Sequence, residues 1–214
     1  MSARHRARLL ALAARTHSNF GELEQAGQVA FAALAAASEA GDTWAMGWAL
    51  HVLTIVTAVQ GQLTSALPQF DRALTVTQVD PALTDLRLLL QINKAVTLGN
   101  LDQFEEAFAA ARQARHLADQ VGTVVRLSQA HTTLGKLLFD AGSWDDAMAE
   151  VELLQEDLKE PAAACNDHCI AAVICFHRGE ITAARRHPSA AIPHAKRTGN
   201  QVLGPLGSLG DVGL

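Results

Sequence analysis

A pattern of about forty residues recurs along the chain and constrains its fold more than any other feature. Each copy has a glycine, an alanine five residues later, and apolar or small residues four and seven positions further on, as in Gly142, Ala147, Val151 and Leu154. The turn positions are residues 21, 61, 102, 142 and 179, which are 40, 41, 40 and 37 residues apart; Asp102 replaces glycine in the third. A period of this length is typical of stacked repeats, because one such unit cannot bury its apolar face alone.

The residues around each turn position predict a pair of α-helices. Junctions such as Gly41-Asp42 and Glu160-Pro161 separate the copies and supply helix caps and breakers. Pro188 is expected to break the last helix. The predicted first helices span 6–18, 43–59, 84–98, 124–140 and 166–177, and the second helices span 23–40, 63–77, 104–120, 144–159 and 181–197. The fold expected from these pairs is all-α, a right-handed α-solenoid of about five helix-turn-helix repeats.

The composition agrees with closely packed helices. Hydrophobic residues make up 49% of the 214 residues, aromatic residues only 5%, and tyrosine is absent. Alanine is a strong helix former and lets backbones approach, and one alanine is expected at each helix crossing. These alanines are Ala26, Ala66, Ala107, Ala147 and Ala184.

The charge and the cysteines bound the classes of function. A formal net charge of −5 argues against direct nucleic-acid binding, which needs clustered basic residues. Cys165, Cys169 and Cys175 form no disulfide framework and suit a reducing cytoplasm. The basic and apolar start of the chain superficially resembles a signal peptide but continues into helical periodicity, so it is expected to be the first helix. No run is apolar and long enough to predict a membrane span.

The fourth copy resembles the tetratricopeptide repeat (TPR), because Leu134-Gly135, Gly142 and Ala147 match that family's positions while Leu138 replaces its usual aromatic residue. The longer repeats are similar to the helical region of MalT-like, LuxR-family large ATP-binding transcriptional regulators of high-GC bacteria. In that family the solenoid lies between an ATPase domain and a helix-turn-helix domain. Neither a phosphate-binding loop nor a basic recognition helix occurs in this sequence, so those two activities are not expected here.

The repeats are expected to form one TPR-like domain over residues 1–200. Residues 201–214 are glycine-rich and read as a tail or the degraded start of a further repeat. The resemblance suggests a fragment of a larger regulator or a stand-alone relative that kept only the scaffold.

The resemblance also implies a concave groove lined by the first helix of each repeat. A cationic and aromatic groove would suit an acidic or amphipathic peptide or protein segment. For each residue singly, ordinary packing or solvation is the competing interpretation. The predicted groove residues are Arg8, Arg15, Trp48, His51, Gln129, Thr132, Lys136, Phe139, Asn166, Cys169 and Phe176.

The cysteines and histidines near residue 170 raise the question of chemistry. Cys165 and Cys169 share a helix face, and His168 lies one position away. Cys175 is ten residues after Cys165, about 15 Å along the helix axis, which is too far for all three thiols to bind one metal ion. No metal and no cofactor is therefore predicted, although a partial site using a residue of another helix stays open.

Two functions remain in view. The first is a non-catalytic interaction or regulatory scaffold, derived from a transcriptional regulator and located in the cytoplasm. The second is an enzyme or small-ligand-binding protein that uses His51, His131, His168 and Cys169 on the same scaffold. The last repeat has no polar capping helix, so self-association through it is a further expectation.

Overall fold

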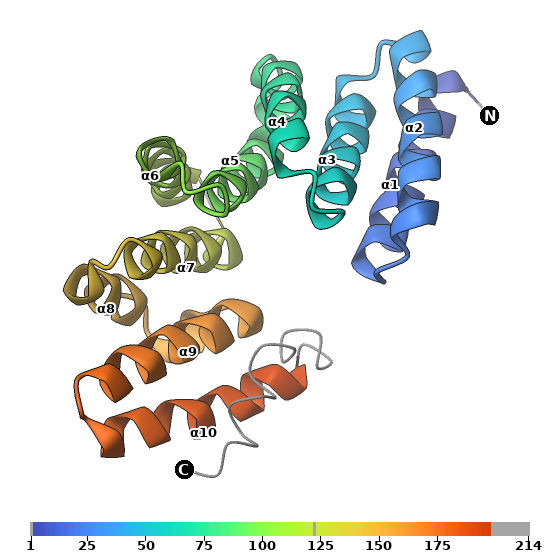
Figure 1. Ribbon diagram of the computed structural model, residues 1–214. Helices are drawn as coiled ribbons and strands as arrows, with labels where there is room; N and C mark the ends of the chain where they lie inside the picture. Colours follow the sequence, from blue (N-terminus) through green and yellow to red (C-terminus); the bar gives the residue numbers. More distant parts are fainter. Residues whose placement is uncertain (1, 122, 198–214) are drawn as a thin grey trace. The chain divides into compact units, whose positions relative to one another are not determined.

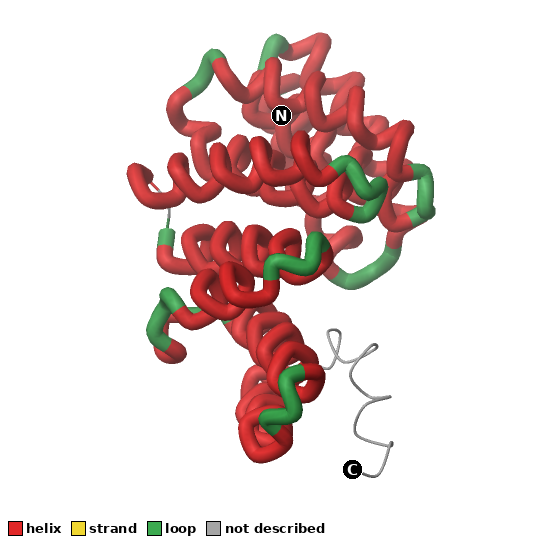
Figure 2. The backbone as a smooth tube through the Cα atoms, turned by 60° about the vertical axis from the view of Figure 1, so that its left-hand side comes forward, coloured by secondary structure: helices red, strands yellow, loops and turns green. Residues whose placement is uncertain are grey.

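The computed structural model describes residues 2–121 and 123–197, and their regular structure is helical with no strand among them (Figures 1 and 2). Ten α-helices and two short 3-10 helices follow one another in these ranges. They are α1 (Ala3–Asn19), α2 (Leu23–Ala40), α3 (Thr43–Val59), α4 (Leu63–Gln78), η1 (Pro81–Leu83), α5 (Thr84–Gly99), α6 (Phe104–Val121), α7 (Val124–Asp140), α8 (Trp144–Glu152), η2 (Glu156–Leu158), α9 (Pro161–His177) and α10 (Ile181–Arg197). The predicted all-α class and the helix-turn-helix repeats are confirmed.

The five predicted turns share one backbone geometry. Gly21, Gly61, Gly142 and Gly179 have φ between 76° and 80°, a left-handed conformation that glycine adopts without steric cost. Asp102 has φ 58° and is the one non-glycine residue with positive φ in the described ranges. At each turn this residue donates its N–H three residues back, and the next residue donates five back, as Ser143 does to Leu138. The degenerate third copy therefore keeps the turn of the other four.

Two expected helices end differently in the structure, and a third, expected over 166–177, begins earlier, because Pro161 opens α9 with Glu160 as its N-cap. The second helix of the fourth copy was expected to reach residue 159, but α8 ends at Glu152. The Lys159 ammonium donates to the carbonyl oxygen of Val151 at 2.7 Å, so a side chain replaces the next helical turn there.

The other difference is that the last helix does not break at Pro188. Helix α10 runs through both Pro188 and Pro193. Each proline removes one backbone hydrogen bond. The helix is retained because Ala191 and Ala195 are buried with Cys165 of α9.

The chain divides into two compact units, with the boundary between Leu117 and Ala118. In unit 1, α1 packs on α2 and α3 packs on α4, while neighbouring first helices α1 and α3 also touch. In unit 2, α7 packs on α8, α9 on α10, and α7 on α9. The single repeat domain expected over residues 1–200 stays a prediction, and residues 201–214 lie outside the described ranges.

Small residues make the helix crossings close, as expected. Ala26, Ala66, Ala107 and Ala147 are fully buried, whereas Ala184 is half-buried. At Gly135 of α7, an added Cβ would lie 2.7 Å from Cγ1 of Val151 on α8, so this crossing needs glycine.

Among the described helices, none combines the length and the apolarity that a membrane crossing requires.

Candidate functional site

In unit 1, cationic side chains of α1 lie on aromatic side chains of α3. The Arg15 guanidinium carbon is 3.5 Å from the centre of the Trp48 ring, and that of Arg8 is 5.6 Å from Trp44. The two tryptophan rings are 6.2 Å apart, and His51 meets Trp48 edge-on at 5.7 Å. We call Arg8, Arg15, Trp44, Trp48 and His51 the Arg–Trp cluster. Stacking of guanidinium groups on indole rings is attractive through the ring quadrupole and holds both groups in place.

A buried carboxylate fixes one end of this cluster. Asp42 is the N-cap of α3, where Oδ1 accepts from the Ala45 N–H at 3.0 Å. Its Oδ2 lies 2.7 Å from Nε of Arg8 and 3.4 Å from Nε of Arg4. Burial alone would raise the pKa of Asp42, but the Ala45 N–H and the two guanidinium groups together lower it. Asp42 is therefore a carboxylate that ties α1 to the start of α3.

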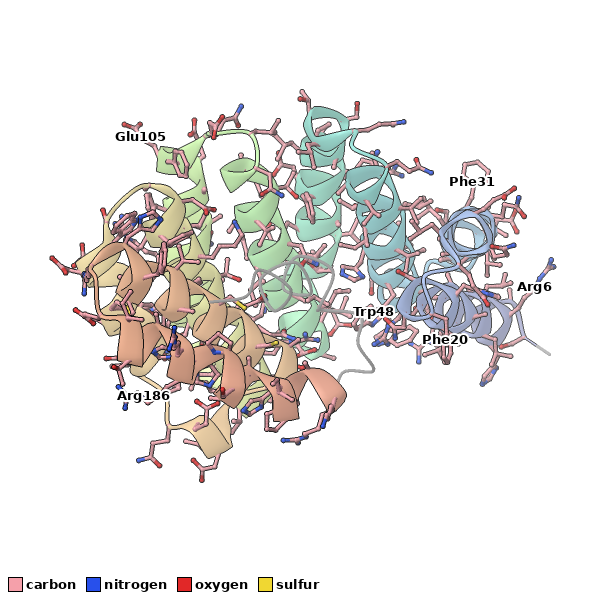
Figure 3. The ribbon with its side chains drawn as sticks, turned by 60° about the horizontal axis from the view of Figure 1, so that its bottom comes forward. Arg6, Phe20, Phe31, Trp48, Glu105 and Arg186 are labelled. Carbon is pink, nitrogen blue, oxygen red and sulfur yellow. The ribbon has the colours of Figure 1, made fainter. Side chains whose placement is uncertain are left out.

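The other end of the cluster reaches α5. Nε2 of His51 lies 3.2 Å from the side-chain nitrogen of Asn93, so three successive first helices, α1, α3 and α5, contribute to one face. Trp48 is only 7% exposed and belongs to the hydrophobic core beneath this face. Phe31, which the sequence did not single out, projects from α2 into solvent and is 71% exposed (Figure 3).

The predicted groove residues of α7 are mostly engaged inside unit 2. Thr132 is buried and donates to Oδ1 of Asp167 on α9 at 2.8 Å. Gln129 accepts from Arg126 on its own helix, and Lys136 forms an ion pair with Asp140 one turn on. Phe139 stacks on Trp144 of α8 with centroids 6.3 Å apart, which makes it a packing residue between the two helices.

The predicted residues of α9 divide between interior and surface. Asn166 and Phe176 are exposed. Cys169 is half-buried, and its thiol donates to the carbonyl oxygen of Cys165. Within unit 1, the four predicted groove residues gather in the Arg–Trp cluster. Within unit 2, the seven others divide among buried, paired and exposed positions.

The three cysteines are unpaired thiols. Burial raises the pKa of Cys169 to about 12, and burial also raises the pKa of Cys165 and Cys175. A thiol must ionise to act as a nucleophile or a metal ligand, so these environments oppose both roles. Sγ of Cys165 lies 4.0 Å from the carbonyl oxygen of Ala191 on α10.

The other histidines named in the enzyme hypothesis have separate partners. His131 is buried, and its Nδ1 lies 2.5 Å from Oε1 of Glu150 on α8. His168 contacts Glu156 and His187 in unit 2. His131 thus faces α8 and not an open groove.

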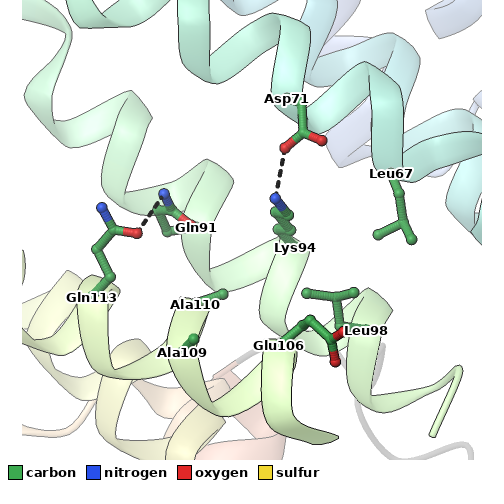
Figure 4. Close-up of a pocket in the computed structure, with 9 residues that line it drawn as sticks. All are labelled: Leu67, Asp71, Gln91, Lys94, Leu98, Glu106, Ala109, Ala110 and Gln113. Atoms are coloured by element: carbon green, nitrogen blue, oxygen red, sulfur yellow. Dashed lines mark hydrogen bonds and ion pairs between the residues drawn. The ribbon is translucent and has the colours of Figure 1, made fainter. Parts of the chain in front are cut away.

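A cavity of about 380 Å³ lies between α4, α5 and α6 of unit 1 (Figure 4). Lys94 of α5 pairs with Asp71 of α4 at 2.6 Å on its wall, and Gln91 donates to Gln113 of α6 at 3.2 Å. None of its nine lining residues is a histidine or a cysteine. These residues are Leu67, Asp71, Gln91, Lys94, Leu98, Glu106, Ala109, Ala110 and Gln113.

Sequence reasoning missed Trp44, Asp42 and Asn93. Trp44 was detectable, because it lies four residues before Trp48 and such pairs share a helix face. Asp42 was interpreted only as a junction residue. Its ion pairs with Arg4 and Arg8 join residues 38 and 34 positions apart, so they form only when the α1–α2 hairpin packs against α3.

Comparison with known proteins places the fold among TPR-like solenoids. No protein-family model matches the sequence, and no curated protein matches it significantly. The crystal structure of BtubC from P. vanneervenii is 20% identical, with a TM-score of 0.66, covering 91% of this chain and 80% of that one. A Rap protein complexed with competence and sporulation factor is 14% identical with a TM-score of 0.77, and the match covers 92% of this chain but only 56% of Rap. YrrB, a TPR protein with an unusual peptide-binding site, is 21% identical with a TM-score of 0.51, over 85% of this chain and 82% of YrrB.

Proposed function

We propose that this chain is a non-catalytic protein-interaction scaffold whose Arg–Trp cluster binds an acidic or amphipathic segment of a partner protein. The observation that carries the proposal is the cluster itself, in which two guanidinium groups, two indoles and an imidazole share one face of unit 1. Arginine and tryptophan dominate binding energy at protein interfaces, because both offer a large rigid contact area together with hydrogen-bond donors.

The local charges favour an acidic segment. Two arginines, Arg4 and Arg8, share one carboxylate, that of Asp42, so this end of the cluster has more positive than negative charge. Their side chains are 63% and 49% exposed, which leaves donor groups accessible to a partner carboxylate. Arg15 is held over Trp48, so less side-chain entropy is lost when a ligand binds it.

The structural neighbours support a scaffold role. Rap was crystallised with competence and sporulation factor, and YrrB has a peptide-binding site. Within unit 2, Lys136, Asn166 and Phe176 are the predicted groove residues that a partner could still reach.

The geometry favours a scaffold over the alternative, an enzyme using groove histidines and cysteines. That alternative required an enclosed pocket in which a histidine meets a cysteine or a carboxylate. The His131–Glu150 contact lies between α7 and α8 and does not line the cavity between α4, α5 and α6, which has neither histidine nor cysteine in its wall. The raised pKa of Cys169 opposes a thiolate nucleophile.

Titration with designed peptides tests the proposal. Short acidic amphipathic peptides, basic peptides of the same apolar content and scrambled acidic peptides are compared by fluorescence anisotropy, with tryptophan emission as a second signal. We expect selective binding of the acidic amphipathic set, weakened by salt because the contact is electrostatic. Arg15→Gln should reduce that affinity about tenfold or more.

The matched control is Arg72→Gln, which removes an exposed arginine from α4 of the same unit. Equal affinity for all three peptide sets, or equal losses in the two variants, would reject the Arg–Trp cluster as the binding face. Trp48→Ala is unsuitable as a binding test, because truncating this core residue would cost about 3–5 kcal/mol of stability.

The remaining parts of the proposal rest on single observations. A cytoplasmic location is supported by three unpaired thiols. Descent from a transcriptional regulator is supported only by the resemblance of the repeats. Self-association would use the outer face of α10, where Ile181 and Ile192 are about half exposed, and light scattering after size exclusion would detect it.

A further inference from the structure

Two histidines and a glutamate meet in unit 2 where η2, α9 and α10 come together. Nε2 of His168 lies 3.1 Å from Oε1 of Glu156, and Nε2 of His194 lies 2.8 Å from the same oxygen. One ligand atom from each of these three residues lies within 4.8 Å of the other two. Of the three, sequence reasoning singled out His168 alone, because the members are 12 and 26 residues apart on three different elements.

We propose that Glu156, His168 and His194 bind a divalent transition-metal ion of the Zn²⁺ type, with water completing its coordination. Two imidazoles and one carboxylate are a ligand set that suits zinc and its neighbours, whereas Ca²⁺ and Mg²⁺ prefer oxygen ligands. Ligands about 2.1 Å from a tetrahedral ion are about 3.4 Å from one another. The two distances to Oε1 of Glu156, 2.8 and 3.1 Å, are shorter than that value, and the half-exposed Glu156 side chain has room to move outward and open them.

A further histidine orients one of the ligands. Nδ1 of His168 lies 3.2 Å from Nδ1 of His187, on the side of the ring away from Glu156. With His187 as the acceptor of this hydrogen bond, His168 would donate from Nδ1 and present the lone pair of Nε2, the arrangement common for metal-bound histidine.

The surrounding charges are compatible with a cation. Nζ of Lys159 lies 3.7 Å from Oε2 of Glu156, but it is closer to Oδ2 of Asp167, at 3.0 Å. Its charge is therefore shared with a second carboxylate.

Such an ion would join three elements. Glu156 lies on η2, in the segment that replaces the missing end of α8, while His168 and His194 lie on α9 and α10. The ion would tie this segment to the last helix pair.

The test uses the tag-free chain stripped of metal by a chelator. Co²⁺ is titrated first, because its visible absorption reports tetrahedral nitrogen and oxygen ligands; Zn²⁺ is then measured by displacement of Co²⁺ and by competition with a chromophoric chelator. We expect one Co²⁺ per chain, displaced by Zn²⁺ but not by Mg²⁺. His194→Gln and Glu156→Gln should each weaken binding more than tenfold, and His187→Gln should weaken it about 10- to 100-fold.

The matched control is His17→Gln, which removes a histidine whose Nδ1 contacts Glu22 at 2.5 Å in unit 1. This variant should bind Co²⁺ as the wild type does. Absence of the cobalt spectrum in the wild type, or unchanged affinity in both Glu156→Gln and His194→Gln, would overturn the proposal. Circular dichroism checks folding; if His194→Gln unfolds, the exposed position of Glu156 lets Glu156→Gln decide the matter alone.

Discussion

Units 1 and 2 use the same turn but fill their interiors differently. The main core cluster of unit 1 is apolar, with Phe70, Leu83, Leu86 and Leu90 packed against alanines. The buried threonines of unit 1 donate to carbonyl oxygens of their own helices, as Thr54 does to Leu50. Unit 2 instead joins buried polar groups of different elements: Thr132 and Lys159 both bind Asp167, and Glu160 donates its N–H to Ser128 at 3.0 Å. Unit 2 is also where the regular repeat is interrupted, at the end of α8.

The difference shows that a repeat can give up the regular length of its helices where a buried polar side chain needs a particular hydrogen-bond or ion-pair partner. An apolar interior accepts any apolar residue of suitable volume, so the copies of the repeat can keep long helices although their sequences differ. A buried polar group needs its own partner. Lys159 meets that need by leaving the helical path and reaching both Val151 and Asp167, so the chain gives up the last turns of α8 for this contact.

The largest expected effect tests whether this polar interior holds unit 2 together. Lys159→Met keeps the volume but leaves the Asp167 carboxylate buried without its cation, which should destabilise the protein by about 3 kcal/mol. Burial already raises the pKa of Asp167, against the lowering by Lys159 and Thr132. The carboxylate of the variant is penalised only when ionised, so its stability should recover as the pH falls through the raised pKa. Urea unfolding at several pH values measures both effects.

The control is Arg87→Met, which removes a partly buried cation of unit 1 whose guanidinium bonds Thr84 and the carbonyl oxygen of Gln78. We expect a cost of about 1 kcal/mol, with no recovery in acid, because no buried carboxylate is left behind. Equal losses and equal pH profiles for the two variants would remove the distinction between the interiors.

A smaller effect is expected at the buried carboxylate of unit 1. Asp42→Ala removes a helix N-cap and a partner of two arginines, and should cost about 2 kcal/mol. Because the pKa of Asp42 is lowered on folding, its stabilisation is complete above the ordinary carboxyl pKa and is lost as the pH falls through the lowered value. Thermal unfolding across that acidic range should show a flatter profile for the variant than for the wild type.

Asp42→Asn separates the two roles, since asparagine caps a helix as well as aspartate does. It should retain most of the stability near neutral pH and still lose the pH dependence. If Asp42→Asn is as unstable as Asp42→Ala, the whole loss of stability is due to the missing charge and none of it to the helix cap.

The fold was predictable to a far greater extent than the site. Turn positions 21, 61, 102, 142 and 179 were found because glycine spacing and helical periodicity are local signals. The end of α8 was missed because it depends on Lys159 meeting Asp167, and the metal-ligand group was missed because Glu156, His168 and His194 meet only when η2, α9 and α10 pack. A helical frame indicates which residues share a face, but not which of them a neighbouring helix covers, as the buried Thr132 shows.

The smallest expected effect concerns the turn that both units share. Asp102 holds φ 58°, where a side chain is strained, whereas the equivalent position is glycine in the other four turns. Asp102→Gly should therefore stabilise unit 1 by about 0.5 kcal/mol, the relief of strain being partly offset by the greater freedom of glycine in the unfolded chain. The mirror change Gly61→Ala should destabilise the same unit by about 1 kcal/mol, because alanine must adopt φ 79°. Paired urea titrations measure the sign of each change in the free energy of unfolding. A loss of stability in Asp102→Gly would mean that the aspartate side chain itself stabilises the third turn. The five turns would then have the same backbone conformation for two different physical reasons.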